Sequence, residues 1–161
     1  VAIAYAEAGQ MRLGGVYDPM RDECFSAEKG KGAWLNGAPL QVSETQTLDR
    51  SLLVTGFPYD IRTGSQTNLE NFDRFSLSAQ AVRRLGSAAL DLCYVAAGRF
   101  DGYWEMSLEA WDIAAGSLIA REAGAVVSDI HGSPDFMQPP HSILAAPAGV
   151  HAQMLQVLRN E

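Results

Sequence analysis

Apolar and polar residues alternate along the first forty positions, and this period of two predicts β-strands. The segments VAIAYAEAG and MRLGGVYDP each alternate and end at turn residues. The next twenty residues add a hairpin with Asn36-Gly37 at its turn, which is a strong hairpin signal between apolar residues. We therefore expect residues 1–42 to form strands of one antiparallel sheet, a β-meander within a first unit of residues 1–50.

The pattern changes after residue 50, where short apolar segments alternate with stretches of helical period. Strands are expected at 51–57, 82–86, 101–106, 125–132 and 142–148, and helices at 67–81, 87–98, 107–124 and 149–160. In the first helix Leu69, Phe72 and Leu77 recur at helical spacing. The third is expected to begin at Ser107 and end at Gly124, and to pack on the surrounding layer. Together these elements predict an α/β layer over residues 51–161.

Composition and charge narrow the classes of function. The chain has 161 residues and a formal net charge of -7, which argues against direct binding of nucleic acid. No apolar run approaches the ~20 residues needed to span a bilayer, so we expect a soluble chain. Cys24 and Cys93 are far apart and form no metal-binding pattern, so we expect reduced, mostly buried cysteines in a cytoplasmic protein.

The first residues carry separate information. The chain opens without Met, directly inside an apolar, strand-like run, whereas natural chain ends are usually polar and loose. Removal of a tag or a short leader is one explanation. We favour the other, that the sequence is the C-terminal part of a longer chain.

Asp112 is the first candidate for chemistry, because it lies in an otherwise apolar stretch, AWDIAAG. Burying a carboxylate is costly unless it is paired or coordinated. One interpretation is a helix-end carboxylate that complements the helix dipole. The other is a ligand for a hard cation such as Mg²⁺, with the small residues Ala114, Ala115 and Gly116 allowing a backbone or a ligand to come close.

Two further segments could bind a ligand. Gly86-Ser87-Ala88 stands where a strand runs into a helix, so its backbone N–H groups could bind an anion or a hydroxylated ligand. The alternative is a plain helix start with Ser87 as N-cap. Glu105 closes the following strand, where open α/β sheets bind ligands, although a solvated glutamate is the alternative.

The remaining polar residues are given simpler interpretations. Asp91 is expected on a solvated helix face and Asp101 at a turn. Arg83 and Arg84 either attract a phosphate or solvate a strand edge. No role is assigned to the histidines, which show no metal-binding spacing: His131, His141 and His151.

The segment WDIAAGSLIAREAGA resembles the C-terminal signature of the inositol monophosphatase family, W-D-x-A-A-G-x-x-[apolar]-x-x-E-A-G. The resemblance continues through RRLGSAALDLCYVAAGRFDGYWEM and GVYDPMRDECFSAEKGKGAWLNGAPLQVS, and so covers essentially the whole chain. It implies the C-terminal part of a layered αβαβα sugar-phosphatase sandwich. The opening meander would belong to its large antiparallel sheet and the rest to its C-terminal α/β layer.

The resemblance also implies an activity. Asp112 would bind the second Mg²⁺ of a Mg²⁺-dependent, Li⁺-sensitive phosphomonoesterase that acts on myo-inositol monophosphate or a similar polyol phosphate. Gly86, Ser87 and Ala88 would line the substrate's hydroxyls, Glu105 would hydrogen-bond one of them, and the protein would be a homodimer. The alternatives are a sugar bisphosphate or phosphoadenosine nucleotide as substrate, or a non-catalytic role binding the transcription machinery.

The sequence departs from the family in one respect. The upstream glutamate pair and the D-P-[apolar]-D-G-T segment, which supply most metal ligands in the family, are absent, and YDPMRDE at 17–23 lacks the D-G-T. One aspartate does not make a two-metal site, which needs several carboxylates. We therefore expect the enzymatic activity of the parent protein and none from this chain alone.

Overall fold

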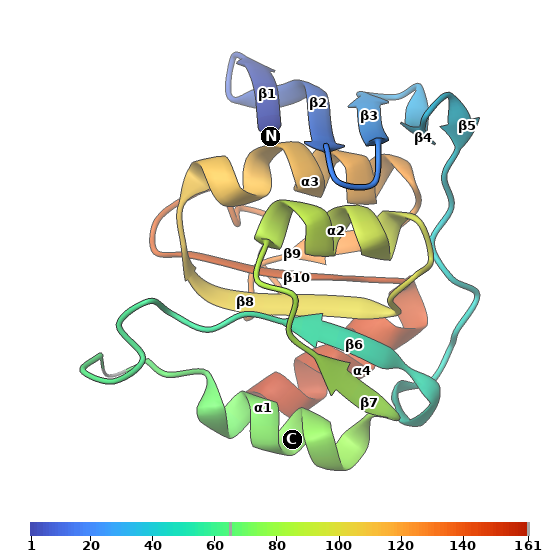
Figure 1. Cartoon of the computed structure of the whole chain (residues 1–161). Coiled ribbons are helices and arrows are strands. Elements are labelled where there is room, and N and C mark those ends of the chain that lie inside the picture. Colours follow the sequence, from blue (N-terminus) through green and yellow to red (C-terminus); the bar gives the residue numbers. More distant parts are fainter. Residues whose placement is uncertain (65, 161) are drawn as a thin grey trace.

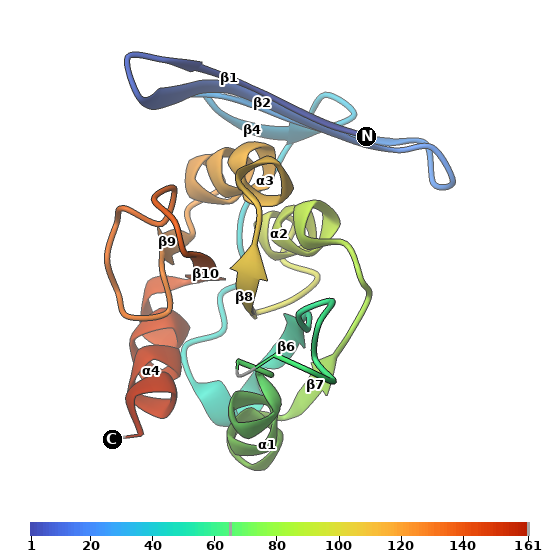
Figure 2. The same cartoon turned by 90° about the vertical axis from the view of Figure 1, so that its left-hand side faces the viewer.

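The protein is built in four layers, which are visible in two perpendicular views (Figure 1, Figure 2). The computed structural model describes residues 1–64 and 66–160. An antiparallel sheet forms one outer layer, two helices lie beneath it, a mixed sheet follows, and two further helices cover its other face. This is the layered α/β fold class expected from the sequence.

The outer sheet is the meander predicted for residues 1–42. Its strands pair antiparallel in chain order, β1 (Ala2–Glu7), β2 (Gln10–Asp18), β3 (Glu23–Glu28), β4 (Gly32–Leu35) and β5 (Ala38–Pro39). Asn36 and Gly37, in the last turn, have φ angles of 50° and 82°. Both central residues of a type I′ turn need positive φ, and Asn-Gly is the pair that adopts it most readily.

The second sheet is mixed in direction. Its strands are β6 (Leu52–Thr55), β7 (Ala81–Arg83), β8 (Gly102–Leu108), β9 (Val126–Ser128) and β10 (His141–Ala146), in the order β7-β6-β8-β10-β9. β6 runs parallel to both of its neighbours, whereas β10 runs antiparallel to β8 and to β9. A short 3₁₀ helix (Leu48–Arg50) leads from the first sheet into β6.

The described part of the chain contains four α-helices, where the sequence predicts them. They are α1 (Leu69–Ser78), α2 (Ala88–Ala96), α3 (Ala110–Glu122) and α4 (Ala148–Arg159). The predicted start of α3 is wrong, because β8 continues to Leu108 and Ser107 has a left-handed φ of 58°. Glu109 is the residue that precedes the first turn, and Gly124, with φ 101°, follows the last turn as expected.

The helix α1 forms as predicted, but two of the three apolar residues whose spacing predicts it are exposed. Leu69 and Leu77 are 53% and 83% exposed, and Phe75 is the residue that is fully buried. The Phe75 ring packs on Trp104 of β8, with ring centroids 4.2 Å apart. The hydrophobic spacing gave the helix, but it did not identify which of several apolar positions meets the sheet.

Two hydrophobic clusters lie on the two faces of the mixed sheet. The cluster between the sheets surrounds α2 and α3 and includes Phe25, Leu92, Tyr103, Ile113 and Ile119. The cluster on the opposite face joins the sheet to α1 and α4 through Leu53, Phe75, Trp104, Leu144 and Met154. Helix α3 therefore packs on the mixed sheet, as the sequence predicts, and also on the antiparallel sheet (Figure 2).

The small residues of α3 are explained by close packing. A Cβ built on Gly14 of β2 would lie 2.8 Å from the carbonyl oxygen of Ala115, and one on Gly116 would lie 2.8 Å from Cβ of Leu92 on α2. Such distances leave no room for a side chain. The stripe of small residues after Asp112 thus lets a strand and a helix approach α3, and it needs no bound ligand to explain it.

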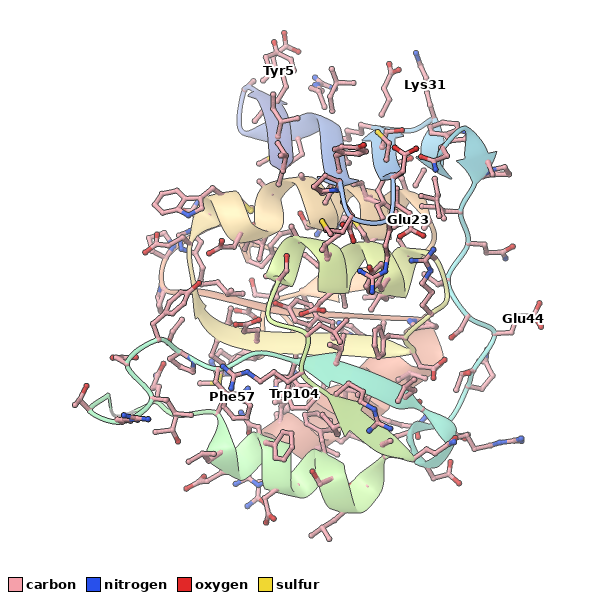
Figure 3. All side chains as sticks on the ribbon, in the orientation of Figure 1. Tyr5, Glu23, Lys31, Glu44, Phe57 and Trp104 are labelled. Atoms are coloured by element: carbon pink, nitrogen blue, oxygen red, sulfur yellow. The ribbon has the colours of Figure 1, made fainter. Side chains whose placement is uncertain are left out.

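The outward face of the antiparallel sheet is open. Every residue of β1 is exposed, including Ile3 at 73%, and Tyr5 projects away from the helices (Figure 3). Cys93 is buried as predicted, but Cys24 is exposed, and both thiols are free. Among the described residues no helix is both long enough and apolar enough to cross a membrane.

Candidate active site

Glu105 lies in the middle of β8, beside the point where the parallel strand β6 ends. The hydroxyl of Tyr103, two residues earlier on the same face, donates a hydrogen bond of 2.5 Å to Glu105 Oε2. Burial raises the pKa of Glu105, and the negative charge of Asp112 adds to this, while the Tyr103 hydrogen bond and Arg84 oppose it. Glu105 is therefore a half-buried, firmly held carboxylate and not a solvated one.

Asp91, on α2, corrects the sequence interpretation most clearly. It was expected on a solvated helix face, yet it is 0% exposed. Neither of its carboxyl oxygens has a hydrogen-bond partner within the described part of the chain. Burial, with Glu105 as the second cause, raises its pKa to about 8, so at neutral pH it is mostly a protonated carboxylic acid.

Asp112 lies in the first turn of α3 and is half-buried. Its Oδ2 accepts a hydrogen bond of 3.1 Å from the backbone N–H of Glu109, so the carboxylate stabilises the start of the helix. Burial raises the pKa of both Tyr103 and Glu105, and the negative charge of Asp112 adds to both shifts. The helix-end interpretation is thus correct in geometry, and the hydrogen bond that supports it uses Oδ2 only.

Gly86-Ser87-Ala88 connects β7 to α2, as the sequence predicted. Ser87 occupies the N-cap position, but its side chain makes no capping hydrogen bond. Its carbonyl accepts the first helical bond, 2.8 Å from the N–H of Asp91. The Ser87 hydroxyl thus makes no capping bond and lies one helical turn before Asp91, whose pKa is raised by burial and by Glu105.

The two arginines that precede this segment differ in their surroundings. The Arg84 guanidinium lies 5.0 Å from the ring centre of Phe57 and is close enough to lower the pKa of Glu105. Arg83 is exposed and donates to the carbonyl of Val82 at 3.0 Å. Arg84 is therefore a charged neighbour of the site, whereas Arg83 solvates the strand edge.

The structure brings three acidic side chains from three elements into one electrostatic group, Asp91, Glu105 and Asp112 around the buried phenol of Tyr103. Sequence reasoning named two of them. Tyr103 could have been found from its position two residues before Glu105 on a strand, since such residues share a face. Asp91 had no comparable signal, because a single aspartate in an apolar helix is equally compatible with a position on the solvent-exposed face of that helix.

The residues described do not form a complete metal centre. Within residues 1–64 and 66–160 no three His, Cys, Asp or Glu side chains are grouped so as to hold a metal ion. Asp112 offers one carboxylate, whereas a two-metal site needs several. Among the described residues, the acidic group by itself therefore does not make a metal site.

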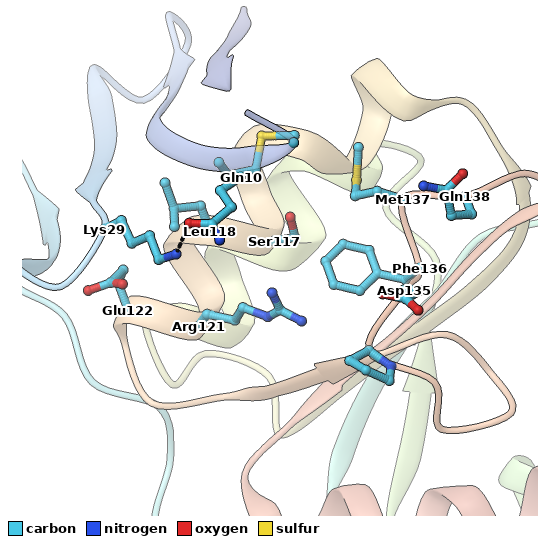
Figure 4. Close-up of a pocket in the computed structure, with 13 residues that line it drawn as sticks. Gln10, Lys29, Ser117, Leu118, Arg121, Glu122, Asp135, Phe136, Met137 and Gln138 are labelled. Atoms are coloured by element: carbon cyan, nitrogen blue, oxygen red, sulfur yellow. Dashed lines mark hydrogen bonds between the residues drawn. The ribbon is translucent and has the colours of Figure 1, made fainter. Parts of the chain in front are cut away.

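Two cavities lie away from the acidic group. One, of about 390 Å³, lies along the second half of α3, with Lys29, Arg121 and Phe136 among its lining residues (Figure 4). The other, of about 320 Å³, is apolar and opens between β1 and the first turns of α3, beside Trp111. None of Gly86, Ser87, Ala88, Glu105 and Asp112 lines either cavity.

The fold and the site define an α/β sandwich with acidic side chains gathered where α2, α3 and the mixed sheet meet. Comparison with known proteins then gives the family. The model of the inositol monophosphatase family matches residues 1–161, and the chain belongs to this family.

Individual relatives agree with this assignment. The Nus factor SuhB of Escherichia coli K12 is 44% identical over 161 residues, which are 100% of this chain and 60% of the relative. The inositol monophosphatase of Anabaena (Nostoc) sp. PCC 7120 superimposes with a TM-score of 0.95 at 40% identity, over 99% of this chain and 63% of that one. A structure of SaIMPase-II with inositol monophosphate bound gives a TM-score of 0.86 at 29% identity, over 99% and 61% of the two chains.

The chain covers only part of the length of each of these relatives. The chain spans about 60% of the length of the curated relatives that it matches. We use "the whole protein" below for a protein that contains this chain at the full length of those relatives.

Proposed function

We propose that the whole protein is a Mg²⁺-dependent phosphomonoesterase that hydrolyses myo-inositol monophosphate or a similar polyol phosphate. The observation that carries this proposal is the Glu105 carboxylate, which a 2.5 Å hydrogen bond from Tyr103 holds at the end of β6. An oriented carboxylate is a strong acceptor for a sugar-type hydroxyl, because hydrogen bonds to charged groups are stronger than those to neutral ones. The inositol monophosphate bound to SaIMPase-II supports this substrate class.

Each predicted site residue then has a distinct task. Glu105 accepts a hydrogen bond from a substrate hydroxyl, and Gly86, Ser87 and Ala88 line the same hydroxyls. The Ser87 side chain can donate to them because it makes no capping bond. Asp112 would contribute one carboxylate toward Mg²⁺, which would supply charge neutralisation for the phosphoryl group when bound.

Replacing Glu105 with Gln tests the substrate part of the proposal. Glu105→Gln keeps the size of the side chain and removes its charge. We expect kcat/KM of the whole protein for inositol monophosphate to fall about 10- to 100-fold, the range for a lost hydrogen bond to a charged group. Phosphate release at saturating Mg²⁺ measures it.

The matched control is Glu44→Gln, an exposed glutamate on the opposite side of the molecule from Phe57 (Figure 3). Equal activity in the two variants and the wild type would contradict the role given to Glu105. The wild-type whole protein should also be assayed on the alternative substrates. Faster hydrolysis of a sugar bisphosphate or a phosphoadenosine nucleotide than of inositol monophosphate would favour these substrates instead.

A second candidate function is a partner-binding role with the transcription machinery. The observation that favours it is 44% identity to a protein named as a Nus factor. Such a role would not require the metal site, so the whole protein with Asp112→Asn should still be retained on RNA polymerase. Loss of both turnover and retention in this variant would count against an independent partner role.

Sizing of the whole protein tests the expected homodimer.

A further inference from the structure

Gly56 is the first residue after β6 and lies directly beside Glu105. Thr55 of β6 pairs with Trp104 of β8, so the next positions along the two parallel strands are Gly56 and Glu105. Paired residues on neighbouring strands point their side chains to the same face of a sheet. A side chain at position 56 would therefore compete with Glu105 for the same space.

The carboxylate of Glu105 occupies the place where that side chain would begin. A Cβ built on Gly56 would overlap Oε1, Oε2 and Cδ of Glu105. The φ angle of Gly56 lies outside the left-handed region, so its backbone conformation does not itself demand glycine. Space for the Glu105 carboxylate is the remaining reason for glycine at this position.

Neither backbone can move away to make room, because buried hydrogen bonds fix both strands. Thr55 Oγ1 donates to the carbonyl of Trp104 at 2.6 Å. The amide of Asn68 donates to the carbonyl of Gly56 at 2.8 Å and accepts from Trp104 Nε1 at 2.9 Å. Thr55, Asn68 and Trp104 are all buried. A new Cβ would therefore displace the flexible end of Glu105, not the strands.

We propose that Gly56 is a positioning residue for substrate selection, because its missing side chain lets the Glu105 carboxylate fold back over the end of β6 and reach Tyr103. In this retracted position the carboxylate leaves room for a polyol ring and still accepts from one of its hydroxyls. A side chain at position 56 would push the carboxylate off Tyr103 and into the space of the substrate. This inference rests on the proposed function, since it concerns the same polyol substrate.

The test compares Gly56→Ala with wild type in the whole protein on two phosphate esters. Inositol monophosphate offers hydroxyls to Glu105, whereas p-nitrophenyl phosphate offers none. We expect the ratio of the two kcat/KM values to fall about 10- to 100-fold in Gly56→Ala, mainly through a higher KM for inositol monophosphate. Gly15→Ala is the matched control, because its new Cβ would make only an ordinary contact, 3.6 Å from Ile3 Cγ2.

A double-mutant cycle with Glu105→Ala separates positioning from damage to the fold. With no carboxylate left to displace, Gly56→Ala should cause no further fall in the ratio, so the two changes should be strongly non-additive. Equal losses on both substrates, additive losses in the cycle, or no change in the ratio would each overturn the proposal.

A crystal structure of Gly56→Ala gives a readout that does not depend on activity. We expect the Glu105 carboxylate to have left the Tyr103 hydroxyl, and a retained 2.5 Å hydrogen bond would overturn the inference. If the wild-type whole protein does not hydrolyse inositol monophosphate, the proposed function fails, and this structure still decides whether Gly56 positions Glu105.

Discussion

The buried carboxyl group of Asp91 should make the stability of the protein fall as the pH rises. Its pKa is raised from 3.8 to about 8 in the folded state, mainly by burial. The folded protein therefore holds a proton that the unfolded chain releases. The free energy of unfolding therefore keeps its full value from this group below about pH 4 and falls progressively as the pH rises toward 8. Above about pH 8 this group causes no further fall.

The expected magnitude follows from the pKa difference. One pKa unit corresponds to about 1.4 kcal/mol, so this group lowers the free energy of unfolding by about 3 kcal/mol between pH 5.5 and pH 8. Asp91 is 0% exposed, so solvent does not screen the effect. The change Asp91→Asn preserves the shape of the side chain and removes the titration, so the variant should lack this loss.

Urea unfolding at pH 5.5 and pH 8, with a chelator present to remove metal, measures the effect. The stability of Asp91→Asn relative to wild type should increase by about 3 kcal/mol from the lower to the higher pH. Asp73→Asn, an exposed aspartate on α1, is the control and should show no such trend. A difference between Asp91→Asn and wild type that is the same at both pH values would refute the reasoning, because it would mean that Asp91 is ionised in the folded protein.

Two further predictions concern the metal and the length of the chain. In the whole protein, Asp112→Asn should lower both Mg²⁺ affinity and turnover, the latter on the order of 10²–10³-fold, as measured at limiting Mg²⁺; near-normal activity would leave Asp112 as a helix-end residue only. Residues 1–161 expressed alone should show no inositol monophosphate hydrolysis and should self-associate on a sizing column, because the outer face of the antiparallel sheet is exposed. An active monomer would contradict both expectations.

The sequence was sufficient for most of the fold, because the local signals agree with the final structure. The alternation in residues 1–42 reflects a sheet with one face packed on the helices and the other exposed. Asn36-Gly37 adopts the positive φ angles that its turn requires. These features depend on neighbours in the chain. The start of α3 was predicted wrongly because Ser107 is a good N-cap residue, yet the pairing of β8 with β10 extends the strand to Leu108.

The site was less predictable, because it depends on contacts between distant elements. Nothing near Asp91 in the sequence indicates that α2 is covered on all sides, and nothing near Gly56 indicates a glutamate beside it. The small residues after Asp112 were ambiguous, since close packing and ligand binding both favour them. The roles of Glu105 and Asp112 stay predictions that the experiments above would test, and the role of the segment 86–88 stays a prediction as well.

The position of α3 between the two sheets has a consequence for how the molecule opens. Its backbone meets the backbone of β2 at Gly14, and at Gly116 it packs directly on the Leu92 side chain of α2, so neither contact can loosen gradually. Residues 113–120 of this helix are all buried. Local fluctuations that expose their amide groups to solvent would have to separate the two sheets as well. Amide hydrogen exchange in α3 should therefore be as slow as global unfolding allows, and the two sheets should behave as one cooperative unit that is joined through this helix.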